Sequence, residues 1–256
     1  MFNFDNHSLF IIFFSILFGG IVKGSVGIGM SMFSVPIIAF ILPPTTAMML
    51  LCFPVLITNF LQMKVQKGIG SFRFLPMYIA LIFGLLIGGK LILNLDFSSI
   101  SKIIAITIIV TTIFNFFGLS FKNLKHRYEK VLTIFLGFFS GILGGLSTFY
   151  APPLIAYLVS ANLDKEFFIR TVASMYFVGS IPLYSSLIYH GLGTTSDLLM
   201  SSYLVIPAII GQFFGTKIRN RLSNTVFRKC TLIVLLVIGL SLLIKNIPVE
   251  KFLQIN

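Results

Sequence analysis

A lysine and three glycines interrupt an apolar stretch near the N-terminus, in the segment KGSVGIGMSMFSVP, residues 23–36. Glycine permits a turn inside a hydrophobic run, and the helix that follows a turn presents free backbone N–H groups and the positive end of its dipole. An ammonium beside such donors is typical of a site for an anion. The segment is therefore interpreted as an anion-binding loop, with Lys23 placed to hold the charge.

Composition places the chain in a membrane. About 57% of its 256 residues are hydrophobic and about 10% are charged, whereas roughly a quarter of the residues of a soluble domain carry charge. Basic residues outnumber acidic ones 19 to 7, but they cluster between apolar runs. This pattern favours cytoplasmic loops facing anionic lipid over a nucleic-acid surface. Cys52 and Cys230 lie in or beside apolar runs, which favours packing roles over a disulfide or a metal site.

Two kinds of apolar segment are present. Two regions, 8–43 and 131–160, each hold two apolar pieces of roughly 11–16 residues around a Gly/Ser-rich turn, and each is predicted to be a hairpin of half-helices returning to its own side. Six other runs are long enough to cross a bilayer: 45–63, 73–93, 101–118, 168–189, 198–216 and 230–246.

Loop charge fixes the predicted orientation. With hairpins, the loops at 64–73, 119–130, 161–170 and 217–229 share one face and hold 14 of the 19 basic residues, Arg219 among them. The positive-inside rule makes that face cytoplasmic and puts both termini outside. If regions 8–43 and 131–160 were broken full spans instead, the chain would have eight helices and the N-terminus would lie inside.

An internal repeat divides the chain into halves. A shift of 117 residues lays Gly20, Gly24, Gly27 and Pro36 on Gly137, Gly141, Gly144 and Pro153. The predicted fold is an all-α polytopic membrane protein with a first half (1–118), a basic cytoplasmic connecting loop (119–130) and a second half (131–256). The two halves would be inverted, each a Gly-rich hairpin plus three membrane helices, as in carriers that alternate their access. The alternative is that the glycine spacing only lets helices pack closely.

The charges within the membrane favour an anion. All seven acidic residues are expected in termini or loops, so no carboxylate is expected deep in a span, where carriers of cations usually need one. Neutral polar side chains remain in the apolar segments, and their ordinary roles are bonds to their own backbone or between helices. They include Asn59, Gln62, Ser140, Ser147, Thr148 and Gln212. For Lys23 the alternative is that it snorkels to an interface.

An enzyme is disfavoured. His7, His126 and His190 lie at ends or in loops, so the sequence offers no nucleophile with a buried base and no metal cluster. No cofactor is expected. A channel or a non-transporting membrane scaffold stays open as an alternative, because paired hairpins also occur in channels.

A resemblance to a known family sharpens the function. The segments GGIVKGSVGIGMSMFSVPIIAFILPP and GFFSGILGGLSTFYAPPLIAYLV resemble the two motifs of the sulfite exporter TauE/SafE family. Met30 stands where the family often has a glycine, and GGLST is a weaker glycine run. The resemblance implies a multi-pass permease of the bacterial cytoplasmic membrane whose partners are lipid and a small anion such as sulfite, a sulfonate or thiosulfate, with no nucleic acid. No oligomeric state is indicated. The predicted substrate-binding residues are Lys23, Gly24, Ser25, Gly27, Gly29, Gly141, Gly144, Gly145, Ser147 and Thr148.

Overall fold

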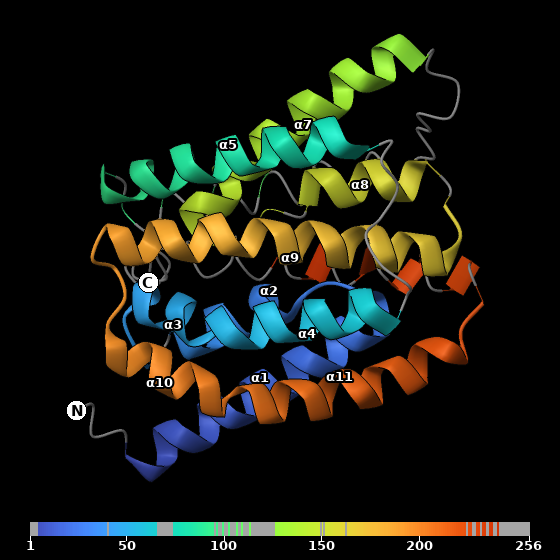
Figure 1. Cartoon of the computed structure of the whole chain (residues 1–256). Coiled ribbons are helices and arrows are strands. Elements are labelled where there is room, and N and C mark those ends of the chain that lie inside the picture. The colour runs from blue at the N-terminus through green and yellow to red at the C-terminus, as the bar shows by residue number, and fades with distance from the viewer. Residues whose placement is uncertain are drawn as a thin grey trace, which may run out of the picture.

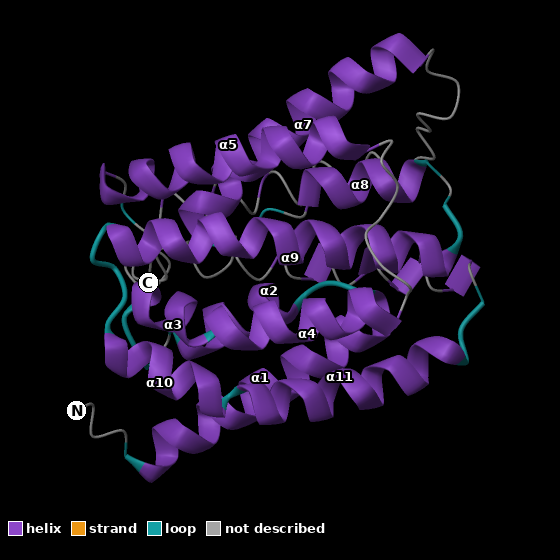
Figure 2. Ribbon diagram, in the orientation of Figure 1, coloured by secondary structure: helices purple, strands orange, loops and turns teal. Residues whose placement is uncertain are grey.

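The computed structural model describes most of the two halves. The described residues are 5–39, 41–65, 74–94, 126–148, 152–161 and 163–223, with isolated positions 96, 99, 102, 106, 109, 113, 150, 225, 226, 229, 230, 232, 233, 236, 237 and 240. Within them all regular structure is helical (Figure 2), so the predicted all-α polytopic fold class is confirmed. The predicted runs 101–118 and 230–246 lie largely outside the described residues.

The helices follow in the order drawn in Figure 1. They are α1 (Asn6–Val26), α2 (Met30–Ile38), α3 (Pro44–Leu50), α4 (Cys52–Val65), α5 (Leu75–Leu91), the 3-10 helix η2 (Ile92–Asn94), α7 (His126–Ser147), α8 (Pro152–Ser160), α9 (Lys165–Tyr189), α10 (Thr195–Tyr203) and α11 (Val205–Asn220).

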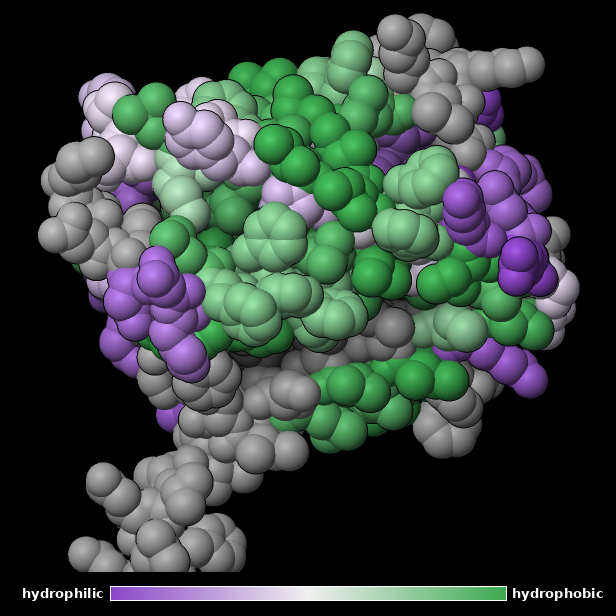
Figure 3. Space-filling view, turned by 90° about the horizontal axis from the view of Figure 1, so that it is seen from below, coloured by the Kyte–Doolittle hydropathy of each residue, from purple (hydrophilic) through white to green (hydrophobic). Residues whose placement is uncertain are grey.

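Hydropathy predicted the spans because a backbone in lipid must satisfy its own hydrogen bonds, which a continuous apolar helix does. The described part of the chain holds five helical stretches long and apolar enough to cross a membrane, with α3 and α4 counted together and α10 and α11 together. The 17-residue helix α5 is the shorter apolar one. Figure 3 shows apolar residues gathered in a band with hydrophilic residues at its two ends, as expected of a lipid-facing surface.

The first hairpin has unequal arms. α1 has 21 residues and α2 has 9, and the two arms are joined by reciprocal hydrogen bonds between Ser15 and Ser34: each hydroxyl donates to the other's backbone oxygen, at 3.4 and 2.9 Å. The second hairpin also has unequal arms, with 22 residues in α7 and 9 in α8. The prediction that every piece is too short to span is therefore wrong for α1 and α7.

The two turns differ in composition. Gly27 (φ 87°) ends α1 and Gly29 (φ 107°) precedes α2, which are left-handed conformations that favour glycine. In the second hairpin the predicted turn glycines, Gly141, Gly144 and Gly145, lie inside α7 instead. The helix runs on to Ser147, and the left-handed residue that follows it is Thr148 (φ 66°), the last residue of the predicted set, so the turn begins later than the glycines suggested.

Glycines bring two pairs of parallel helices into close contact. α1 packs on α11 through Gly20 and Gly24 against Gly211 and Gly215, and α5 packs on α7 through a similar set, Gly84 and Gly88 against Gly141 and Gly145. The close packing that the alternative explanation gave to these glycines is thus observed. Judged by these contacts, Gly20 and Gly24 of the first half are equivalent to Gly141 and Gly145 of the second half. The shift of 117 residues had paired them with Gly137 and Gly141, which lie four residues earlier.

The arrangement supports the predicted inversion. In Figure 1, α1 runs from left to right and α7 from right to left, while α4 and α9 pack together between the two glycine-contacting pairs. One end of the molecule, on the right in Figure 1, holds the ends of α4, α8 and α11 and the starts of α5, α7 and α9. The four predicted basic loops adjoin these helix ends in the sequence. The inverted repeat, the domain boundaries and the orientation in the membrane stay predictions.

Candidate functional site

Lys23 lies in the last turn of α1 and is buried, with 3% of its surface exposed. Its ammonium nitrogen Nζ donates to Oδ1 of Asn59 at 2.8 Å and to Oε1 of Gln62 at 2.7 Å, both on α4. The head group therefore lies buried between α1 and α4 instead of extending along the surface, which argues against the snorkelling alternative.

Neutral oxygens, not carboxylates, solvate this charge. Within the described part of the chain Lys23 makes no ion pair, and its hydrogen bonds go to two side-chain amides. An ammonium has only donors, so it fixes both amides with their oxygens toward Lys23. The Asn59 amide then donates through Nδ2 to Val55 O at 2.7 Å, whereas Nε2 of Gln62 is buried without a partner.

Arg219 is a second buried cation, and sequence reasoning assigned it to a cytoplasmic loop. α11 continues to Asn220, so Arg219 lies in its last turn with 2% of its surface exposed. Nη1 donates to Gly24 O at 3.3 Å, and Nε is buried without a partner. One signal was available: Gly211, Gly215 and Arg219 are spaced by four, which places the arginine on the glycine face of a helix.

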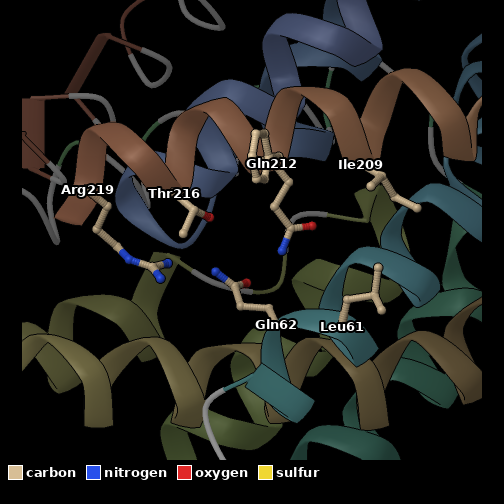
Figure 4. Close-up of a pocket in the computed structure, with 7 residues that line it drawn as sticks. Leu61, Gln62, Ile209, Gln212, Thr216 and Arg219 are labelled. Carbon is tan, nitrogen blue, oxygen red and sulfur yellow. The ribbon is translucent and has the colours of Figure 1, made fainter.

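A cavity of about 200 Å³ opens between α4 and α11. In Figure 4 the amide nitrogen of Gln62 faces the guanidinium of Arg219 across it. Arg219 Nε and Gln62 Nε2 are buried and have no hydrogen-bond acceptor among the described residues, which is costly unless a ligand supplies one. The lining residues are Leu61, Gln62, Ile209, Gln212, Phe213, Thr216 and Arg219.

Gln212 adds one acceptor to the cavity wall. Its Nε2 donates to Thr58 O at 3.1 Å, which leaves Oε1 buried without a partner. A ligand that carries a hydrogen-bond donor would match this acceptor. Gln62 and Gln212 were recognised in the sequence only as polar side chains inside apolar runs.

The predicted first turn lies beside this cavity. Gly27, Gly29, Ser31 and Asn59 line a separate hollow of about 10 Å³ next to Lys23, which is no larger than the space for one water. Ser25 donates to Ile21 O and Val22 O of its own helix, both at 2.9 Å. Gly24 packs on α11. Of the first predicted set, Lys23 and Gly24 form hydrogen bonds to residues of the cavity wall: Lys23 donates to Gln62, and Gly24 O accepts from Arg219.

The predicted second turn lies apart from the cavity. Gly141 and Gly145 pack on α5, and a Cβ on Gly144 would come within 2.2 Å of Tyr150 Cβ. The Ser147 hydroxyl donates to Leu143 O at 2.6 Å, while Thr148 Oγ1 is buried without a partner. The structure therefore does not bring the two predicted sets of ligands together in the cavity.

Two carboxylates are less exposed than predicted. Glu129 lies in the first turn of α7 and accepts from Tyr157 OH at 2.6 Å, and Asp197 caps α10 together with Thr194. Both are buried but lie in the first turn of a helix, not deep in a span. No group of three or more His, Cys, Asp or Glu within the described residues could hold a metal ion.

Comparison with known proteins identifies the family. The family model described as "Sulfite exporter TauE/SafE" matches residues 12–242. Neither a search of curated proteins nor a search of solved structures gave a match. Because the family match covers most of the chain, the protein belongs to the sulfite exporter TauE/SafE family, a family of membrane transporters.

Proposed function

We propose that the protein carries sulfite or a related small sulfur oxyanion across the bacterial cytoplasmic membrane, and that it binds the anion between Arg219 and Gln62. The observation that carries this proposal is that the Arg219 guanidinium and the Gln62 amide nitrogen face each other across the cavity, while Arg219 Nε and Gln62 Nε2 are buried without a hydrogen-bond partner among the described residues. Family membership supports a sulfite-type anion as the cargo.

The size and chemistry of the cavity suit such a ligand. Its volume of about 200 Å³ is below the roughly 300–1,000 Å³ of pockets for drug-sized molecules, which favours an anion of few atoms. Arg219 presents planar donors that match the oxygens of a sulfite or sulfonate group, and burial strengthens each charge-assisted bond. Thr216 and Gln212 supply further polar contacts in the same wall.

The helix packing suggests how access could alternate. Arg219 belongs to α11, which is held tightly to α1 through glycines, whereas Gln62 belongs to α4, which packs on α9. If α1 and α11 move as one unit against α4 and α9, the anion lies at the boundary that opens and closes. Carriers built from inverted repeats use such rocking about a central site.

The test is sulfite transport by purified protein in liposomes. Arg219→Gln should lower transport and raise KM by roughly 10–100-fold, since one charge-assisted bond is worth about 1.5–3 kcal/mol. Gln62→Glu should also abolish transport, because a carboxylate facing Arg219 would take the place of the anion. Arg221→Gln is the matched control: Arg221 is exposed just beyond α11 and should be dispensable.

Each outcome has a meaning for the proposal. Counterflow, in which external anion exchanges with preloaded anion, supports a carrier, and flux without counterflow points to a channel. Absence of any anion flux in the wild-type protein would overturn the function. Normal KM in well-folded Arg219→Gln protein would remove this cavity as the site.

A further inference from the structure

We infer that Lys23 is a positioning residue for the anion site, acting through Gln62, and that together with Arg219 it makes the site prefer dianions over monoanions. This inference rests on the proposed function and names its substrate class. The substrates expected are sulfite, thiosulfate or a sulfonate with a second acid group, in preference to a singly charged sulfonate.

The positioning role follows from the geometry of a side-chain amide. The oxygen and nitrogen of an amide group point in different directions, so an oxygen held by one partner fixes where the nitrogen points. Lys23 Nζ holds Gln62 Oε1 at 2.7 Å, and the Gln62 nitrogen consequently faces the cavity and Arg219. Without the ammonium, the amide is free to turn its oxygen toward Arg219. That oxygen would accept a hydrogen bond from the Arg219 guanidinium, and the anion would lose a donor.

The charge preference follows from the groups around the cavity. Lys23 and Arg219 are each at least 97% buried, and the Gln62 side chain lies between them, with its oxygen on Lys23 Nζ and its nitrogen facing Arg219. Glu166, in the first turn of α9, attracts Arg219 but is exposed, so water screens its charge. Neither cation makes an ion pair within the described residues. A dianion neutralises both buried charges, whereas a monoanion leaves one of them uncompensated.

A purely structural role for Lys23 is the rival explanation. Its two hydrogen bonds also tie α1 to α4, so removing it could loosen the helix packing and weaken every ligand equally. The two explanations differ in the ratio of affinities for ligands of different charge. A structural defect lowers both affinities together, but a lost charge lowers the dianion's affinity more.

The experiment compares two sulfonates of similar size in the liposome assay. Sulfoacetate carries two negative charges and isethionate carries one. Wild-type protein should bind sulfoacetate roughly 10-fold or more tightly, measured by competition with sulfite, because its second charge is attracted to the buried Lys23 ammonium behind Gln62, and a 10-fold difference corresponds to about 1.4 kcal/mol. Lys23→Met should bring this ratio close to one, and Lys23→Arg should restore much of it because the charge survives.

A second variant separates charge from positioning. Gln62→Met removes the positioned donor but keeps Lys23, so both sulfonates should bind more weakly while their ratio stays near the wild-type value. The inference is overturned if wild-type protein shows no preference for sulfoacetate, a measurement that needs no variant. It is also overturned if Lys23→Met folds and keeps the wild-type ratio while Arg219→Gln loses affinity. If Lys23→Met and Arg219→Gln both keep wild-type affinity, the proposed anion site itself is rejected.

Discussion

The glycine contacts between helices give a prediction that can be worked out from distances. Alanine at Gly84 or Gly88 of α5 would place Cβ 2.2 Å from a backbone oxygen of α7, and alanine at Gly211 of α11 would place it 2.1 Å from Leu17 O of α1. Gly179 of α9 is the matched control, because its added Cβ would meet only side-chain atoms, the nearest at 3.2 Å. Backbone atoms cannot turn aside as a side-chain end can.

The magnitude follows from two opposing effects. To restore an ordinary contact, α5 and α7 must separate by about 1 Å, and overpacking of this kind costs about 1–3 kcal/mol. Alanine is the better helix former by about 1 kcal/mol, which offsets part of this cost. The net loss of up to about 2 kcal/mol corresponds to a fall in Tm of up to roughly 8 °C for a chain of this size. Gly179→Ala should leave Tm unchanged or raise it.

Thermal unfolding of purified protein in detergent, at one fixed scan rate, provides the measurement. Once α5 and α7 have separated, a second alanine at the same contact should cost little more, so Gly84→Ala with Gly88→Ala should be less than additive. Gly84→Ala with Gly211→Ala affects two separate helix pairs and should be additive. Equal effects of Gly84→Ala and Gly179→Ala, or additivity within one pair, would refute the argument from backbone contact.

Three further predictions concern the second turn, the first helix and the orientation. Thr148→Gly should raise Tm by a few degrees, because a β-branched residue at φ 66° is strained by about 1–3 kcal/mol, while Thr148→Val should keep the strain; a fall in Tm for the glycine variant would contradict this. Hydrogen bonds from Ser8 lower the pKa of Asp5, so this cap stabilises α1 above the unfolded pKa and loses its effect as pH falls through the folded pKa. The protection of the Ser8 amide against hydrogen exchange, taken relative to the intrinsic exchange rate at each pH, should therefore fall below about pH 4, and Asp5→Asn should flatten that dependence. With Cys52 and Cys230 replaced, a cysteine at Ser196 should react with an impermeant thiol reagent on intact cells and one at Ser223 only after permeabilisation, and the reverse pattern would invert the topology.

Sequence reasoning located the helices better than the breaks between them. The runs 73–93 and 168–189 agree with α5 and α9 to within a few residues, because apolar length is the physical requirement for a span. The second turn was misplaced because α7 carries Gly137, Gly141 and Gly145, spaced by four. A shift of one helical turn then lays glycine on glycine again, and the true break at Thr148 contains no residue that marks it.

The site was only partly predictable for a different reason. Lys23 stood out because a lone cation in an apolar run needs compensation. Its hydrogen-bond partners, Asn59 and Gln62, lie 36 and 39 residues further along the chain, and a local sequence pattern cannot link residues that far apart. Arg219 resembled its neighbours Lys217 and Arg221, which are exposed, and only the face of α11 on which it lies separates it from them.

The glycine contacts and the proposed anion site depend on the same turn of α1. Gly24 lets α11 approach closely, and this approach brings Arg219 to the Gly24 carbonyl oxygen. The preceding residue, Lys23, extends to α4 and fixes Gln62 on the other wall of the cavity. Helix α1 then ends at once, since the Gly27 N–H closes on Lys23 O at 2.7 Å. A bulky residue at position 24 should therefore displace Arg219 and weaken anion binding without touching the ligand, so a glycine first considered a ligand contact contributes to the site through packing.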